Sequence, residues 1–181
     1  MAAVRGSDTL TALVAALAGP GTDAAGGQAG GLVRPVPGRI LLGFNEPDGG
    51  GVRRPGIVVG APALSLVAAP AAGTVRYAGP FLDFGYVVVL ETDAGEPRGA
   101  LVVVLAGLAQ LNVVTGAAVG QGDLLGLLGG RNLTVEEYVM LPHAETGAGA
   151  LETLYIEVRH GRGPVDPEPW FGDENGWKDD R

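Results

Sequence analysis

The two histidines of this chain are the side chains best suited to metal or proton chemistry. His143 lies in the segment LPHAE, and His160 lies in RHGRG, directly after a predicted strand. Neither belongs to a His-x-His or His-Glu-x-x-His pattern, the spacings that let two imidazoles face one metal ion. The chain also has no cysteine that could supply a thiolate ligand. We therefore expect both histidines to be solvent-exposed loop residues.

Other catalytic patterns are weak. Glu136 with Glu137, and Glu91 with Asp93, are the closest carboxylate pairs, but adjacent acids on a helix point apart and such surface pairs are common. Neither of the two serines stands in a Gly-x-Ser-x-Gly turn. There is no P-loop, and glycine fingerprints are expected by chance in a chain with 32 glycines. The residues alone therefore predict a domain without visible catalytic machinery.

Charge and composition narrow the function classes. The chain has 181 residues, with 12 Lys and Arg against 20 Asp and Glu, for a formal net charge of −8. Lys178 is its only lysine. A protein that binds the phosphate backbone needs a clustered basic face, so nucleic acid is excluded as an expected partner. The 46% hydrophobic content can bury a core, which a disordered chain cannot do.

Targeting signals are weak in this sequence. No apolar run reaches the roughly 18–20 residues that span a bilayer. The stretch from Met1 to Gly19 is only weakly apolar, is interrupted by Asp8 and has Arg5 as its one basic residue, so it does not predict a signal peptide. We expect Met1 to open a fragment of a longer chain. The lack of cysteine fits a reducing compartment and a secreted protein without disulfides equally well.

The N-terminal segment predicts one short amphipathic helix. Ser7 or Asp8 is a suitable N-cap, and Gly19-Pro20 ends the helix. Its apolar stripe consists of Leu10, Leu13, Val14 and Leu17. Residues 19–31 contain six glycines and no large apolar side chain, which is typical of a flexible linker.

From Leu32 onward the pattern is β. Short apolar or β-branched runs bounded by Gly, Pro or Asp predict strands within 33–42, 56–59, 66–69, 73–78, 86–92, 100–105, 124–127 and 153–159. The runs YVVVLET and ALVVVL flank a turn-rich link and predict a hairpin whose strands are buried on both faces. Strands at this spacing favour an all-β sheet or sandwich. We expect a helical turn within 132–140 and a surface tail from Pro164, anchored by Trp170, Phe171 and Trp177.

An ordered series of motifs resembles a known family. The series is VRPVPGRILLGF, PGIVVGA, APAAGTVRYAGPFLDFG before YVVVLET, LAGLAQLNVVTGAAVGQGDLLGLLG, and LYIEVRHGRGPVDPEPW. It resembles the LytM-type (lysostaphin-like) zinc peptidase domain, most closely its degenerate, EnvC-like branch of murein hydrolase activators. The resemblance implies a single mainly β domain at 32–171, a β-sandwich with a duplicated hybrid motif, preceded by a helical segment at 1–18 and the linker at 19–31. The acidic tail then comprises 172–181.

The same resemblance implies that the zinc site is lost. Active members hold zinc with a His-x-x-x-Asp pair and the second histidine of a His-x-His strand, and two further histidines assist the metal-bound water. The corresponding positions are Arg54, Val58, Gly107, Thr153 and Tyr155. None of these residues offers the imidazole or carboxylate that zinc requires. We therefore expect no metal, no other cofactor and no hydrolysis by this domain.

The groove that remains implies a protein partner. In the activators the equivalent groove binds and switches on a periplasmic peptidoglycan amidase during cell division. Tyr155 and Arg159 match positions implicated in that activation, and both residue types are enriched in interface hot spots. Phe84 and Arg54 are weaker candidates. The alternative for Arg159 is a strand-end arginine paired with Glu157 or with an acid of the tail.

The N-terminal helix has its own implication. EnvC-like proteins carry a coiled coil that docks on a division-associated, transporter-like membrane complex, followed by a restraining helix that can cover the groove. Residues 8–18 match the end of that region. An 11-residue helix is marginal alone in water, so it must dock or fray. The alternative is a chain end without a role in the groove.

Two other functions stay open at this point, and a third is excluded. One is a zinc endopeptidase with displaced ligands such as His143, His160 and Asp83. Another is a peptidoglycan-binding module without a partner enzyme. The VGQGDLLG turn is also similar to lipoyl and biotinyl carriers, but those need a lysine in an exposed hairpin, and Lys178 lies in the tail.

Overall fold

The computed structural model describes Leu10, residues 12–17, 31–93, 99–129, 151–161 and 163–171, and Trp177. Several sequence-based expectations lie outside these residues. They are the caps Ser7 and Asp8, residues 19–30 of the linker predicted at 19–31, the hairpin loop at 94–98, the helical turn at 132–140 with the pair Glu136 and Glu137, His143, and the acidic tail at 172–181 apart from Trp177.

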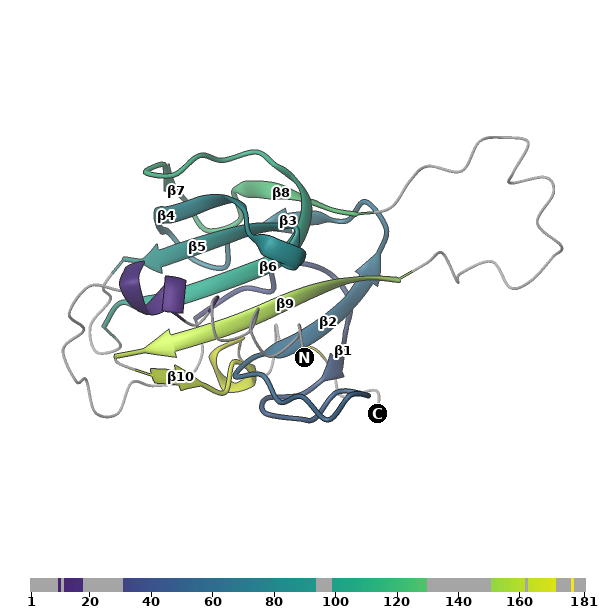
Figure 1. Cartoon of the computed structure of the whole chain (residues 1–181). Coiled ribbons are helices and arrows are strands. Elements are labelled where there is room, and N and C mark those ends of the chain that lie inside the picture. Colours follow the sequence, from purple (N-terminus) through teal and green to yellow (C-terminus); the bar gives the residue numbers. More distant parts are fainter. Residues whose placement is uncertain are drawn as a thin grey trace, which may run out of the picture.

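The described residues build one antiparallel sheet with the strand order β1-β2-β9-β6-β5-β4-β7 (Figure 1). Strand β10 pairs with β9, and β8 joins β3 to β6. The strand bounds are β1 Arg39–Leu42, β2 Ile57–Pro62, β3 Leu66–Ala68, β4 Gly73–Pro80, β5 Tyr86–Thr92, β6 Leu101–Leu111, β7 Ala118–Val119, β8 Leu124–Leu128, β9 Leu151–His160 and β10 Gly163–Val165. Two short 3₁₀ turns, Leu82–Phe84 and Glu168–Phe171, complete the described elements. The expected mainly β fold is confirmed.

The central hairpin follows from its apolar runs. Strands β5 and β6 pair antiparallel, with Val88 opposite Leu105 and Val89 opposite Val104. Four consecutive β5 residues, 87–90, are buried, as expected for a strand covered on both faces. Strands β7 and β10 were not predicted, because runs of two and three residues carry no periodic signal.

Alternating side chains place two apolar clusters on opposite faces of the sheet. On β2, Ile57 and Val59 belong to the larger cluster, here called the main core, and Val58 packs on the other face. The main core also includes Val67 of β3 and Leu125 and Leu128 of β8. The smaller one, here called the second cluster, consists of Leu10, Val14, Val87, Val89, Val104, Ala106 and Tyr155.

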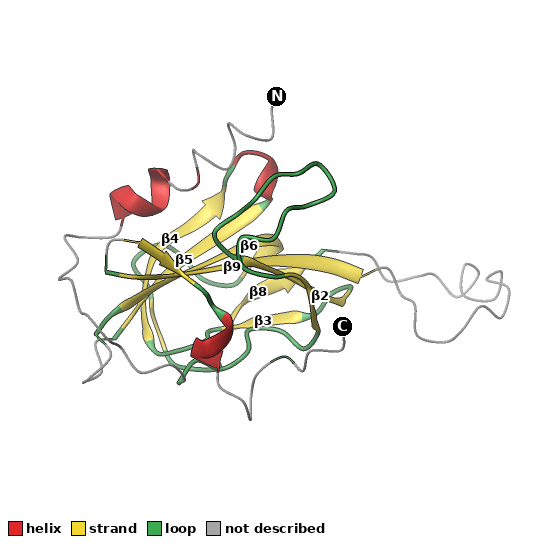
Figure 2. Ribbon diagram, turned by 90° about the horizontal axis from the view of Figure 1, so that it is seen from below, coloured by secondary structure: helices red, strands yellow, loops and turns green. Residues whose placement is uncertain are grey.

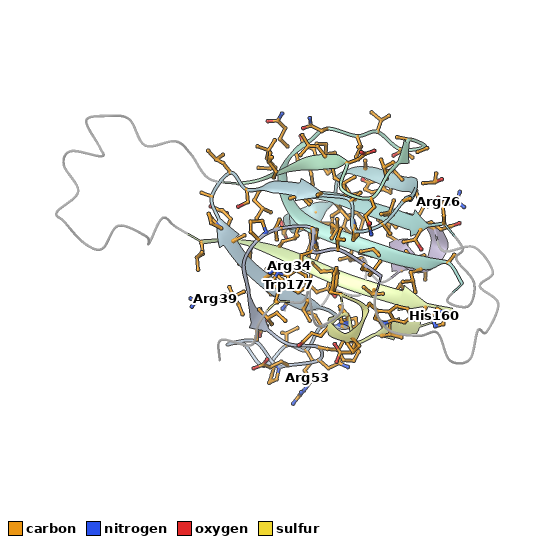
Figure 3. All side chains as sticks on the ribbon, turned by 180° about the vertical axis from the view of Figure 1, so that it is seen from behind. Arg34, Arg39, Arg53, Arg76, His160 and Trp177 are labelled. Carbon is orange, nitrogen blue, oxygen red and sulfur yellow. The ribbon has the colours of Figure 1, made fainter. Side chains whose placement is uncertain are left out.

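Aromatic side chains of the C-terminal segment pack into the main core. Trp170, Phe171 and Trp177 are all buried in it, so the expected aromatic anchor is confirmed. Trp177 is labelled in Figure 3. The rings of Phe171 and Trp177 meet edge to face with centroids 4.7 Å apart. The backbone N–H of Leu32 donates to the carbonyl of Trp170 at 3.1 Å, which ties the first described loop residues to this segment.

The N-terminal helix lies on the face of the second cluster. Leu10 and residues 12–17 are helical, and Leu10 and Val14 are buried, in agreement with the predicted apolar stripe. Figures 1 and 2 place this helix outside the sheet, on one side of it. In the part of the chain that is described, no helix is both long and apolar enough to cross a membrane.

Candidate functional site

Three alternate residues of β9 form a hydrogen-bonded chain on the face of the second cluster. The Tyr155 hydroxyl donates to Oε2 of Glu157 at 3.0 Å. Arg159 Nη1 donates to Oε1 of the same carboxylate at 2.9 Å. Because side chains two residues apart share a face of a strand, the sequence pattern Tyr-x-Glu-x-Arg places all three in one row. One carboxylate therefore joins a phenol to a guanidinium.

This row is buried. Glu157 is 1% exposed and Arg159 is 6% exposed. Burial raises the pKa of the Glu157 carboxyl, and the hydrogen bonds from Arg159 and Tyr155 oppose that rise. Burial and the neighbouring Glu157 carboxylate together raise the pKa of the Tyr155 phenol well above its ordinary value. At neutral pH Tyr155 is therefore a protonated donor and not a phenolate ligand.

The five positions that the family resemblance assigns to the zinc site meet at the same place. Val58 of β2 pairs with Tyr155 of β9. Thr153 lies two residues before Tyr155, and a Cβ on Gly107 of β6 would lie 2.6 Å from the Thr153 carbonyl oxygen. Arg54 is close enough for its charge to oppose the rise in the Tyr155 pKa. The fold thus gathers these five positions, although they are far apart in sequence.

These residues do not fit a zinc ion. Val58 is aliphatic and Gly107 has no side chain. Thr153, Tyr155 and Arg54 carry a hydroxyl, a phenol and a guanidinium. None of them supplies an imidazole or carboxylate ligand. The nearby carboxylate of Glu157 is already engaged by two donors. The described residues contain no group of three or more His, Cys, Asp or Glu that could hold a metal ion.

The expected loop position of His160 was wrong. It is the last residue of β9 (Figure 3) and is partly buried, with its ring centroid 5.4 Å from that of Trp170. Strand β9 runs further than predicted because it pairs with β10 beyond Arg159. Asp83, the other described residue of the displaced-ligand alternative, is exposed in the turn between β4 and β5.

Arg159 has the pairing that the sequence left as an alternative. Its ion pair with Glu157 is buried, so its guanidinium is not displayed on the surface in this conformation. Arg54 forms an ion pair with Asp48 at 2.8 Å and is only partly exposed. Asp48 also accepts the backbone N–H groups of Gly50 and Val52 at 2.9 Å. The hydrogen bond from Val52, followed by that from Arg54, holds the pKa of the Asp48 carboxyl below its ordinary value.

Gly56 is a part of the site that sequence reasoning missed. A Cβ at this position would lie 2.7 Å from both Cζ and the hydroxyl oxygen of Tyr155 and 2.5 Å from the Ile156 carbonyl oxygen. The phenol therefore lies against bare backbone. The PG dipeptide before β2 signals a turn in the sequence, but only the neighbouring strand reveals this close approach.

The N-terminal helix packs over this face. Val14 is fully buried, and it belongs to the second cluster together with Tyr155, two β5 valines and two β6 residues. Phe81 and Phe84, which flank the turn after β4, pack against the same cluster, with ring centroids 6.4 Å apart. The candidate partner residue Phe84 thus lies at the margin of the helix-covered face.

The sequence model of Peptidase family M23 matches residues 53–167. The chain belongs to peptidase family M23. The match begins beside Arg54 and continues past Arg159, so it contains the whole candidate site. The M23 match also covers the Tyr155–Glu157–Arg159 row and the five positions that the resemblance assigns to the zinc site.

Two curated relatives match most of the chain. One is the murein hydrolase activator EnvC of Escherichia coli strain K12, 30% identical over 139 residues, which are 76% of this chain and 28% of the relative. The other is an uncharacterized protein of Haemophilus influenzae, 31% identical over 137 residues, which are 75% of this chain and 28% of the relative. The chain thus spans little more than a quarter of the length of these relatives.

Solved structures agree on the fold. A putative peptidase M23 from Pseudomonas aeruginosa superposes with a TM-score of 0.59 at 21% identity, over 91% of this chain and 60% of that one. The solution structure of lysostaphin superposes with a TM-score of 0.55 at 17% identity, over 74% of this chain and 50% of that one. At these identities the likeness concerns architecture alone, and it confirms the lysostaphin-like fold.

Proposed function

We propose that this M23 domain is a non-catalytic activator of a periplasmic peptidoglycan amidase. The observation that carries the proposal is the Tyr155–Glu157–Arg159 row, which occupies the face where the family resemblance places metal ligands. The similarity to the activator EnvC supports the same role. The proposal places the protein in the periplasm, where peptidoglycan and its amidases lie.

The chemistry of the face suits an amphipathic helix. Its centre is apolar, with valines of β5 and β6 around the Tyr155 ring. A helix with an apolar stripe can cover such a surface, and this chain's own helix does so through Leu10 and Val14. Capture of an inhibitory helix of the amidase on this face would shift the amidase toward its open state.

The intramolecular helix would then compete with the partner. It buries the apolar centre of the face, so the amidase helix must displace it. A protein whose binding-competent state is only partly populated shows a proportionally weaker apparent affinity. Under the proposal, the helix holds activation down until it is released.

The test is dye release from labelled peptidoglycan by purified amidases of the source organism, with and without the domain. We expect release to rise when the domain is added and to rise further when residues 1–30 are deleted. Thr153→Arg places a bulky charge on the exposed start of the site face and should lower activation, because it would obstruct an apolar helix. Ala118→Arg, on the exposed edge strand β7, is the matched control and should leave activation unchanged.

Two further measurements distinguish an activator from the alternative functions. Stoichiometric zinc in the purified protein, together with peptidoglycan hydrolysis by the domain alone, would overturn the proposal in favour of an endopeptidase. Pelleting with purified sacculi, without any effect on amidase activity, would instead indicate a peptidoglycan-binding module. Unchanged activation after deletion of residues 1–30 would contradict the restraining role of the helix while leaving the activator role intact.

A further inference from the structure

The turn between β4 and β5 presents apolar side chains beside the helix-covered face. Leu82 is 63% exposed, and Tyr86 at the start of β5 is 37% exposed. Their neighbours Phe81 and Phe84 are partly buried against the second cluster, the same cluster that Leu10 and Val14 complete. Figures 1 and 2 show the turn and the N-terminal helix on the same side of the sheet. The apolar face thus continues past the part covered by the helix.

Hydrogen bonds hold this turn in one shape. The Phe81 N–H donates to the Gly85 carbonyl at 2.9 Å, and the Phe84 N–H donates to the Phe81 carbonyl at 3.0 Å. The Tyr77 hydroxyl donates to the Pro80 carbonyl at 2.7 Å. The exposed leucine is therefore displayed on a fixed support, which reduces the conformational entropy lost on binding.

Leu82 has an unusual backbone for its residue type. Its φ is +46°, in the left-handed region that glycine and asparagine adopt more readily. Neither burial nor a core contact explains a leucine there, since its side chain is mostly in solvent. Strained backbone of this kind concentrates at binding and switch positions.

We propose that Leu82 and Tyr86 make the first contact with the amphipathic helix of the amidase, before this chain's own helix leaves. The inference rests on the proposed function and adds the order of events at that face. The occupant follows from continuity, because the apolar face next to Leu82 already accepts a helix with an apolar stripe. Exposed Asp83 lies between Phe81 and Phe84 in sequence. A basic residue beside the apolar stripe of the partner helix would therefore complement the negative charge of this turn.

This contact has a kinetic consequence. A partner that makes no initial contact with the closed form can bind only after the helix opens, so its observed binding rate levels off as its concentration rises. A partner that first binds Leu82 and Tyr86 engages the closed form, so its binding rate is not capped by the rate at which the helix opens by itself. Removal of Leu82 should therefore slow association mainly when the helix is docked.

The experiment measures association of each purified, fluorescently labelled amidase of the source organism with the full chain by stopped flow. Leu82→Asn removes the apolar side chain and suits the left-handed backbone, so the variant should fold; Leu82→Gly repeats the test with a second residue that tolerates this φ. Val114→Asn is the matched control, because Val114 is 71% exposed in the link between β6 and β7. Each variant is also made in a Val14→Asp background, in which the helix is undocked.

We expect Leu82→Asn to lower the association rate about tenfold in the full chain and less than about threefold in the Val14→Asp background. Val114→Asn should change neither rate. Equal slowing in both backgrounds, or no slowing at all, would overturn the first-contact role. The proposed function would still stand in that case, provided that the amidase binds. If no amidase bound any variant, including Val14→Asp alone, the proposed function itself would fall, and this inference with it.

Discussion

The Tyr155 hydroxyl donates to the buried carboxylate of Glu157 at 3.0 Å, and the tyrosine lies at a position where the family resemblance expects a metal-binding histidine. A phenol with a raised pKa is a hydrogen-bond donor at neutral pH, so this position supports a neighbouring carboxylate and not a metal ion. The other oxygen of Glu157 accepts from Arg159 at 2.9 Å. These three side chains therefore form a row of hydrogen bonds on one strand.

Tyr155→Phe should destabilise the domain by about 1–3 kcal/mol, because the buried carboxylate loses one of its two donors. Urea denaturation followed by circular dichroism gives the free energy of unfolding. Tyr86→Phe removes a hydroxyl from a more exposed tyrosine and should stay within about 0.5 kcal/mol of the wild type. Equal effects of the two substitutions would show that the Tyr155 hydrogen bond adds nothing to stability.

Glu157→Gln should change how stability depends on pH. Burial raises the pKa of Glu157 in the folded protein above the ordinary value of 4.5 that it regains on unfolding. As pH rises above 4.5, the unfolded state therefore releases its proton first. The free energy of unfolding that Glu157 contributes is full below that pH and is lost as pH rises through the folded pKa.

The measurement is urea denaturation of wild type and Glu157→Gln at a series of pH values. Relative to the variant, the wild type should lose free energy of unfolding as pH rises from 4.5 through the pKa of Glu157 in the folded protein. Parallel curves for the two proteins would mean that the carboxyl titrates alike in the folded and unfolded states.

Gly107→Ala should destabilise the domain by about 1–3 kcal/mol, because its Cβ would overlap the neighbouring strand. The added Cβ would lie 2.6 Å from the Thr153 carbonyl oxygen, and the φ of +108° disfavours any side chain. Thermal unfolding measures the effect. Gly49→Ala, where no atom lies within 4 Å of the added Cβ, is the control and should change stability little. A tolerated alanine at 107 would mean that β6 and β9 can separate locally and that a larger side chain could be accommodated there.

Val14→Asp should release the N-terminal helix without unfolding the sheet. Burying a lone carboxylate costs several kcal/mol, and the main core does not include Val14, so undocking is the cheaper outcome. Hydrogen exchange should show lost protection at residues 12–17, with the β5 and β6 amides still protected. Ala16→Asp, on the exposed side of the same helix, should leave protection unchanged. Loss of protection throughout the sheet would indicate that the helix is part of the folding core.

Local patterns were sufficient to predict most strands of this domain. Apolar runs such as VVVL predict that both faces of β5 are buried, and turn residues mark where the runs end. These two signals predict the hairpin with β6 without any tertiary information. The N-terminal stripe likewise predicts that Leu10 and Val14 face inward. Short pieces such as β7 and β10 escape this reasoning, because they exist only through pairing with a longer strand.

By itself, the sequence determined which ligand atoms the chain can offer, since Arg54, Val58, Gly107, Thr153 and Tyr155 are fixed by residue type. Only the tertiary structure decided that these positions meet, because strand pairing joins β2, β9 and β6 across a long stretch of chain. It also decided that Arg159 is paired and buried and that a helix covers the face. Burial and pairing depend on which surfaces pack together, and no single segment carries that information.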